Sequence, residues 1–327
     1  MKNINWSELG FGYFKTDYNV RCEYKDGKWG ELYATEDVNM NIHMASTCLH
    51  YGQEVFEGLK AFRGADGKVR LFRVEENAKR MINSGEYLKM AVPSVELFTK
   101  ACIEAVKLNA DYIPPYGSGA SLYLRPMLIG VGPQVGVKPS ADYLFAVFVT
   151  PVGPYYKDGF NCIKVIIDYD HDRAAPKGTG HVKVGGNYAA SLDSGEIAHQ
   201  KGFASVIFLD PATKQYIDEC SAANFFGIRD GKYITPDSHS VLPSITNKSL
   251  RQIAEDLGLK VEQRKVGVEE LPTFSEAGCC GTAAVISPIG ELAWNDDKYE
   301  VNHNQIGALS QKLYDELTGI QWGTKPD

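Results

Sequence analysis

Short runs of apolar residues, separated by turn residues, recur along the chain and predict β-strands. Asp-Gly pairs at 26–27, 66–67 and 230–231 are typical of hairpin turns between such runs. We expect strands over 69–73, 121–128, 143–150, 163–167, 205–209 and 224–229.

Other segments place apolar residues three and four positions apart, and this spacing predicts helices. In the clearest of them, Ser94 stands at the N-cap position and Leu97, Ala101, Ala105 and Leu108 form the apolar face. Further helices are expected over 75–84, 187–200, 246–257 and 305–318. Strands and helices mix along the chain, so the pattern favours an α/β (α+β) fold.

The segment 151–159 contains two prolines and two glycines and interrupts the pattern, as an interdomain linker does. A chain of 327 residues is also long enough for two domains. We therefore expect a small N-terminal α/β domain over 1–152, a linker over 153–163 and a larger C-terminal domain over 164–327. An active site is expected in the cleft between the two domains.

Composition excludes several classes of protein. The formal net charge is -7, and no basic patch stands out, so a nucleic-acid-binding protein is not expected. The longest apolar run, 143–149, is too short to span a bilayer, and residues 1–6 lack the apolar stretch of a signal peptide. Seven cysteines without framework spacing indicate free thiols in a reducing cytoplasm. The seven histidines show no metal-ligand spacing, so no metal site is expected.

The segment 183–188, Lys-Val-Gly-Gly-Asn-Tyr, is the strongest candidate for chemistry. Its glycines let the backbone turn tightly and let a ligand come close. A lysine placed there is suited to a covalent link with a carbonyl compound if burial lowers the pKa of its amine. The alternative is a surface lysine that precedes a helix.

This segment resembles the cofactor-lysine motif of branched-chain amino acid aminotransferases, which are pyridoxal 5'-phosphate enzymes of fold type IV. Four other segments match the motifs of that family in the same order: 50–62, 122–126, 243–246 and 281–284. The resemblance covers nearly the whole chain. It implies a two-domain fold-type IV enzyme whose larger C-terminal domain binds the cofactor.

The resemblance implies three roles around the cofactor ring. Lys183 forms the covalent link with the cofactor aldehyde and then carries a proton between the substrate and the cofactor. Tyr188 donates a hydrogen bond to the phenolic oxygen of the cofactor. Glu219 pairs with the pyridine nitrogen and keeps it protonated. Asp218 competes with Glu219 for this role, and a solvated acid in a loop is the structural alternative for Glu219.

The resemblance also implies that the cofactor phosphate is bound by Arg80, by the start of the helix at Ile245 and Thr246, and by Thr282. Backbone N–H groups at a helix N-terminus bind anions. Thr246 could instead serve only as a helix cap. Arg70 and Arg73 lie close to Arg80 in the sequence and are the competing cations.

The resemblance also implies a substrate pocket. Thr282 and Ala283 bind the α-carboxylate through backbone N–H groups, and Arg125 binds the distal carboxylate of glutamate. An apolar wall is formed by Tyr51, Phe56, Tyr123, Val137 and Tyr155. Tyr51 and Val137 are implied to come from a partner subunit, so a homodimer with shared active sites is expected. Ordinary core packing is the alternative for the aromatic residues, and a structural role is the alternative for Arg125.

The expected activity is reversible ping-pong transfer of the amino group from L-Leu, L-Ile or L-Val to 2-oxoglutarate. A D-amino acid aminotransferase and a 4-amino-4-deoxychorismate lyase of the same fold are the closest alternatives, and a non-catalytic cofactor-binding protein is a third. Small molecules are the expected ligands, with neither nucleic acid nor membrane as a partner.

Overall fold

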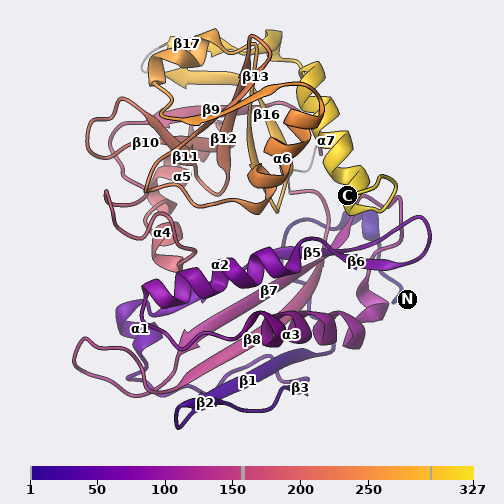
Figure 1. The fold of residues 1–327 in the computed structure, drawn as a ribbon, viewed down its shortest axis with the longest axis vertical. Helices are drawn as coiled ribbons and strands as arrows, with labels where there is room; N and C mark the ends of the chain where they lie inside the picture. The colour runs from indigo at the N-terminus through magenta and orange to yellow at the C-terminus, as the bar shows by residue number, and fades with distance from the viewer. Residues whose placement is uncertain (1, 156–158, 295–296) are drawn as a thin grey trace. The chain divides into compact units, whose positions relative to one another are not determined.

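The computed structural model describes residues 2–155, 159–294 and 297–327. It divides the chain into two units, coloured by residue number in Figure 1. Unit 1 comprises residues 1–155, 182–185 and 321–324, and unit 2 comprises the rest. Each unit carries a sheet and helices, so the predicted mixed α and β class is confirmed. The domain limits at 152 and 164 stay a prediction, and residues 156–158 of the predicted linker lie outside the described part.

The described part of unit 1 forms an eight-stranded sheet in which the paired strands run antiparallel. The strands pair in the order β2-β1-β8-β7-β5-β6, with β3 on β1 and β4 on β7. The hairpins at 26–27 and 66–67 are confirmed, because β1 pairs with β2 and β5 pairs with β6. The strands are β1 (Asn19–Lys25), β2 (Lys28–Trp29), β3 (Tyr33–Thr35), β4 (Glu54–Phe56), β5 (Leu59–Arg63), β6 (Val69–Leu71), β7 (Ser121–Gly130) and β8 (Tyr143–Val152).

The helices of unit 1 are α1 (Thr47–Tyr51), α2 (Val74–Tyr87) and α3 (Val95–Leu108), with short 3-10 turns at Trp6–Glu8 and Ala110–Tyr112. The predicted cap of α3 is confirmed: Ser94 Oγ accepts a hydrogen bond from Leu97 N at 3.2 Å. The buried face of α3 is centred one residue further along than predicted, on Phe98 and Cys102. α3 packs on β1 and β8, and α2 packs on α3 and β4 (Figure 1).

The described part of unit 2 forms a nine-stranded sheet with both parallel and antiparallel pairs. Its order is β11-β10-β9-β16-β15-β12-β13-β14, with β17 on β16. The strands are β9 (Ile163–Asp168), β10 (Ser205–Leu209), β11 (Ile217–Cys220), β12 (Asn224–Arg229), β13 (Lys232–Pro236), β14 (Lys260–Arg264), β15 (Glu276–Gly281), β16 (Val285–Trp294) and β17 (Asp297–Glu300). The helices are α4 (Gly185–Ala189), α5 (Leu192–Gln200), α6 (Ile245–Asp256) and α7 (Ala308–Gln321), with 3-10 turns at Val268–Thr273 and Asn302–Asn304.

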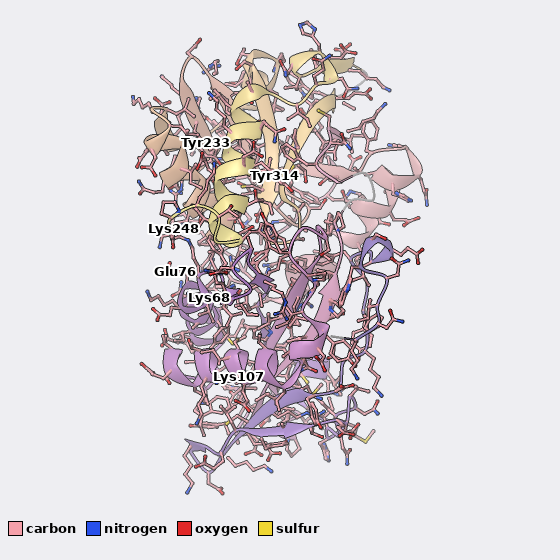
Figure 2. The ribbon with its side chains drawn as sticks, turned by 90° about the vertical axis from the view of Figure 1, so that its right-hand side faces the viewer. Lys68, Glu76, Lys107, Tyr233, Lys248 and Tyr314 are labelled. Carbon is pink, nitrogen blue, oxygen red and sulfur yellow. The ribbon has the colours of Figure 1, made fainter. Side chains whose placement is uncertain are left out.

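Two helices of unit 2 differ from the sequence prediction. The helix expected over 187–200 is two helices, because the Ser191 hydroxyl donates to the Tyr188 carbonyl at 2.9 Å and competes with helix continuation. The last helix starts at Ala308 rather than 305, where the carboxylate of Glu276 accepts from the Leu309 and Ser310 N–H groups at 3.0 and 2.7 Å. Further along α7, Tyr314, labelled in Figure 2, stacks on Phe160 with 4.0 Å between ring centroids.

Asn109 is a stability determinant of unit 1. Its buried side chain accepts from Asp17 N and Tyr18 N at 3.1 Å each and donates to Tyr18 O at 3.0 Å and Ala105 O at 2.8 Å. We expect Asn109→Ala to lower the free energy of unfolding by about 2–4 kcal/mol, because it leaves buried backbone groups without partners. Urea unfolding at unchanged slope measures this. The exposed Asn3→Ala is the control, and an equally small effect of both variants would contradict the prediction.

Candidate functional site

Lys183 belongs to unit 1, where its backbone is held on both sides. Its N–H donates to Ser84 Oγ of α2 at 3.0 Å, and its carbonyl accepts from Phe56 N of β4 at 3.2 Å. The amine lies 4.7 Å from the centroid of the Phe56 ring. Burial, and next the positive charge of Arg80, lower the pKa of Lys183 to about 8. An appreciable fraction of this amine is therefore uncharged just above neutral pH, as a nucleophile or proton carrier requires.

The first glycine after Lys183 is required by its neighbour Glu54. The Gly185 N–H donates to the Glu54 carboxylate, and a Cβ at this position would collide with that same carboxylate. A Cβ at Gly186 would meet no described atom within 4 Å. From the sequence, both glycines were expected to let a ligand come close. In the structure, Gly185 instead leaves room for the carboxylate of Glu54 on β4.

Arg80 pairs with a fully buried carboxylate of the same unit. Arg80 Nε and Nη2 donate to Glu57 Oε1 and Oε2, both at 2.8 Å, and Asn77 Nδ2 donates to Oε2 at 2.7 Å. The competing Arg70 is engaged at the hairpin, where it pairs with Asp66 at 2.7 Å. The positive charge of Arg80 also lowers the pKa of the Lys183 amine, and Arg125 does so to a smaller extent.

Tyr123 and Arg125 alternate on β7 and so share one face of the sheet. Arg125 Nη2 donates to Tyr123 Oη at 3.1 Å, and the guanidinium lies 4.8 Å from the Phe56 ring centroid. Arg125 Nε is buried and has no hydrogen-bond partner among the described residues. The exposed Tyr155 joins this group through the ring of Phe11, which lies 5.3 Å from Tyr155 and 5.2 Å from Tyr123. Four predicted residues of unit 1 therefore gather around Lys183: Phe56, Arg80, Tyr123 and Arg125.

Tyr51 and Val137 lie on an exposed apolar part of unit 1. The Tyr51 hydroxyl donates to the Val135 carbonyl, which places Tyr51 beside the loop that carries Val137. The exposed fractions are 40% for Tyr51 and 86% for both valines. These two predicted pocket residues are thus neighbours, but their exposure distinguishes them from the buried Tyr123.

Glu219 lies on β11 of unit 2 and is buried, so the alternative of a solvated loop acid is wrong. Its Oε1 is ion-paired with Arg173 and accepts from Leu242 N at 3.2 Å, while Oε2 accepts from Asn224 Nδ2 at 2.8 Å. Burial raises the pKa of Glu219, and the charge of Arg173 opposes this rise.

Asp218 is also buried, and burial raises its pKa as well. Adjacent residues of a strand point to opposite faces, so Asp218 and Glu219 serve different surroundings. Asp218 Oδ1 has no hydrogen-bond partner among the described residues.

The predicted phosphate-binding residues of unit 2 lie at the start of α6 and in a turn. Ile245 and Thr246 are the first two residues of α6, and both are buried. The cap is Ser244, whose Oγ accepts from Asn247 N at 3.1 Å, so Thr246 is not the capping residue. Thr282 and Ala283 are half-buried in the turn that joins β15 to β16. Tyr188 is half-buried on α4.

Sequence-based prediction missed several charged and polar contributors. Glu57 and Lys60 lie inside the family motif 50–62, so the motif could have identified them. Burial lowers the pKa of Lys60 to about 8. Arg173 and Asn224 stand in no spacing pattern, and only the fold brings them to Glu219. Phe11 likewise lies outside every motif, so the sequence did not indicate its contact with Tyr123 and Tyr155.

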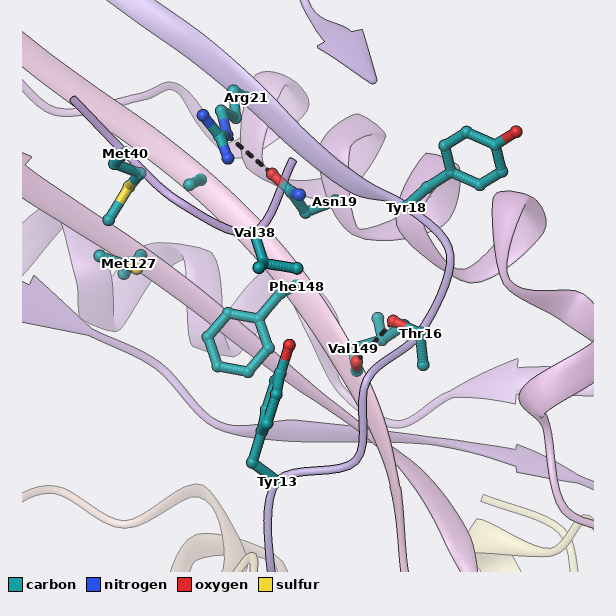
Figure 3. A pocket seen from close by; sticks show the side chains of 11 residues that line it. Tyr13, Thr16, Tyr18, Asn19, Arg21, Val38, Met40, Met127, Phe148 and Val149 are labelled. Carbon is teal, nitrogen blue, oxygen red and sulfur yellow. Dashed lines mark hydrogen bonds between the residues drawn. The ribbon is translucent and has the colours of Figure 1, made fainter. Parts of the chain in front are cut away.

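A pocket of about 290 Å³ lies over β1, β7 and β8 of unit 1 (Figure 3). Tyr13, Val38, Met127 and Phe148 contribute to its lining. Met127 follows Arg125 by two positions on β7, so the pocket opens on the sheet face that carries Arg125. None of the predicted site residues lines it.

Residues 2–155, 159–294 and 297–327 contain no group of three or more His, Cys, Asp or Glu side chains that could hold a metal ion. Over the same ranges, no helix has the length and apolar character needed to cross a membrane.

Comparison with known proteins confirms the family predicted from the motifs. Residues 54–292 match the model of the amino-transferase class IV family. A branched-chain-amino-acid aminotransferase of Haemophilus influenzae is 52% identical, with 99% of this chain and 96% of the relative covered. The solved structure of the branched-chain amino acid aminotransferase of Escherichia coli aligns with a TM-score of 0.78 and 28% identity, over 96% of this chain and 97% of that one. A T.th. branched-chain amino acid aminotransferase, solved in complex with N-(5'-phosphopyridoxyl)-L-glutamate, aligns with a TM-score of 0.75 and 26% identity, over 93% and 95% of the chains. The chain therefore belongs to the class IV aminotransferases, among the branched-chain-amino-acid aminotransferases.

Proposed function

We propose that this chain uses pyridoxal 5'-phosphate to transfer the amino group between L-Leu, L-Ile or L-Val and 2-oxoglutarate. The observation that carries the proposal is the amine of Lys183, whose pKa of about 8 is set by burial and by Arg80. A surface lysine would keep its charge throughout the neutral range. Lys183 instead has the property expected of a group that links to an aldehyde and then moves a proton.

The residues of the chain fit this cofactor. A carboxylate has about four acceptor positions, and Glu219 uses three of them on Arg173, Leu242 and Asn224. Among the described residues, no donor occupies the second acceptor position of Oε2, which suits the N–H of a pyridine ring. The T.th. relative has been solved with a phosphopyridoxyl adduct of glutamate, which supports the same choice of cofactor and of glutamate as one of the two amino acids.

When bound, the cofactor supplies an aldehyde that accepts the amino group and a ring that withdraws electrons. Lys183 then holds and moves the proton at the substrate Cα. Glu219 accepts a hydrogen bond from the ring N–H, and Tyr188 donates a hydrogen bond to the phenolic oxygen of the cofactor. The phosphate is assigned to Arg80, the N–H groups of Ile245 and Thr246, and Thr282, because a helix N-terminus and a guanidinium both favour an anion.

The proposed substrate site serves an apolar and an acidic side chain. Phe56, Tyr123 and Tyr155 supply the apolar wall, and the N–H groups of Thr282 and Ala283 bind the α-carboxylate. Arg125 binds the distal carboxylate of glutamate. The buried Nε of Arg125, which has no partner among the described residues, supports this role, since an unsatisfied buried donor is costly.

We further propose a cytoplasmic homodimer in which Tyr51 and Val137 reach the site of the partner subunit. The support is an exposed apolar surface: Met44 is 81% exposed, and Val135 and Val137 are each 86% exposed. Such a surface is typical of a protein interface. All seven cysteines are free thiols, as suits a reducing compartment.

One experiment tests the proposed function. The purified protein is incubated with pyridoxal 5'-phosphate and reduced with borohydride, and peptide mapping then locates the modified lysine, which we expect to be Lys183. In the unreduced protein, we expect L-leucine to convert the bound cofactor from its aldehyde to its amine form. We expect 2-oxoglutarate to restore the aldehyde form. Conversion of the cofactor by D-amino acids only would favour a D-amino acid aminotransferase, and pyruvate release from 4-amino-4-deoxychorismate would favour the lyase. Cofactor attached to another lysine would refute the assignment of Lys183.

Arg125→Met tests the dual specificity. Desolvating a distal carboxylate needs a cation, whereas leucine needs none. We expect kcat/KM for glutamate and 2-oxoglutarate to fall about 30- to 1000-fold, equivalent to about 2–4 kcal/mol, with a much smaller change for leucine. Single-turnover measurement of each half-reaction separates the two. Equal losses would assign Arg125 to the support of Tyr123 instead.

Glu219→Gln tests the group that faces the ring nitrogen. We expect turnover to fall by on the order of 100-fold, because the amide cannot keep the ring protonated. Cofactor affinity should change much less, because the phosphate contacts are untouched. Asp218→Asn is the matched control on the same strand. A larger loss in Asp218→Asn than in Glu219→Gln would reverse the assignment.

A further inference from the structure

Arg173 is a buried cation in a loop of unit 2, and only 8% of it is exposed. Three oxygen atoms face its Nη2: the Gly180 carbonyl at 2.9 Å, the Ser240 carbonyl at 2.5 Å and the Glu219 carboxylate. Removing a charge from water costs several kcal/mol unless partners compensate it. These three oxygens are the compensation, and they come from three separate segments of the chain.

The three segments are those that carry the proposed cofactor contacts. Gly180 precedes Lys183 by three residues, and Ser240 precedes the cap Ser244 of α6 by four residues. A Cβ at Gly180 would collide with the backbone of Ser240, so the two loops are in direct contact under the guanidinium. Glu219 is the third segment, on β11.

Glu219 is oriented from its other side by an amide chain. Asn224 Nδ2 donates to Glu219 Oε2 at 2.8 Å, and Asn224 Oδ1 accepts from Asn247 Nδ2 at 3.2 Å. Asn247 in turn donates to Thr235 Oγ1 at 2.9 Å and accepts from the Tyr233 hydroxyl at 2.9 Å. This chain fixes the geometry of Glu219 with neutral groups. Arg173 adds a positive charge to these neutral contacts.

We propose that Arg173 is a positioning residue for the cofactor: it keeps Glu219 ionised and joins the loop before Lys183 to the loop before α6. This inference rests on the proposed function, because it assumes that Glu219 faces the ring nitrogen. The burial of Glu219 and the negative charge of Asp218 both raise the pKa of Glu219, and Arg173 opposes them. Without Arg173, Glu219 takes up a proton and can no longer stabilise a protonated ring.

The test uses the full-length protein loaded with pyridoxal 5'-phosphate labelled with ¹⁵N in the ring. The ring-nitrogen chemical shift reports whether that nitrogen is protonated, and a purely structural role would not move it. The variants are Arg173→Met and Arg173→Gln, the latter retaining donors for the Gly180 and Ser240 carbonyls in case the former does not fold. Arg173→Lys restores the charge. The control is Arg264→Met, which removes an arginine of the same unit that pairs with Glu270 at 2.7 Å.

We expect the wild type, Arg173→Lys and Arg264→Met to keep a protonated ring, and Arg173→Gln and Arg173→Met to lose it. In those two variants kcat should fall about 10- to 100-fold, equally for leucine and glutamate, because Arg173 acts through the cofactor. A protonated ring in Arg173→Gln would overturn the inference and leave the proposed function intact. An unprotonated ring in the wild type, or no cofactor on Lys183, would instead refute the proposed function.

Discussion

The cost of burying charge is the constraint on which both units depend. Each unit encloses a glutamate with almost no exposure, and each glutamate is met by one arginine and one asparagine. In unit 1 these are Glu57, Arg80 and Asn77; in unit 2 they are Glu219, Arg173 and Asn224. An unpaired charge at either place would destabilise the fold by several kcal/mol, so neither arginine is free to vary independently of its glutamate.

The two arrangements have different consequences for chemistry. Glu57 occupies two donors of Arg80 in a bidentate pair, which fixes the guanidinium while its charge still lowers the pKa of the nearby Lys183. Glu219 is instead an acceptor with one position to spare, oriented by Asn224 and kept ionised by Arg173. The first arrangement lowers the pKa of an amine, and the second provides a buried carboxylate that can accept a further hydrogen bond.

Sequence patterns predicted the features that depend on neighbouring residues. The cap at Ser94, the hairpin at 26–27 and the strand at 205–209 are local, and all three are present. The motif around Lys183 also led to the correct family. Features set by distant residues were missed: α7 begins where Glu276 caps it, and Arg173 meets Glu219 across 46 positions of sequence. No local pattern encodes such contacts, because the partner is chosen by the fold.

Glycines show how local sequence and distant packing meet. Read alone, the Gly-Gly pair after Lys183 indicates a flexible turn open to a ligand. In the structure, Gly185 lacks a side chain because the carboxylate of Glu54 occupies that space and accepts its N–H. At Gly180, the backbone of Ser240 occupies the space that a side chain would need. Arg173 donates hydrogen bonds to the carbonyls of Gly180 and Ser240. A substitution at either glycine would displace a segment that holds a proposed catalytic group, without altering any group that touches substrate. A glycine that sequence reasoning assigns to ligand access can therefore act instead by letting a structural side chain or backbone reach the segment that carries the chemistry.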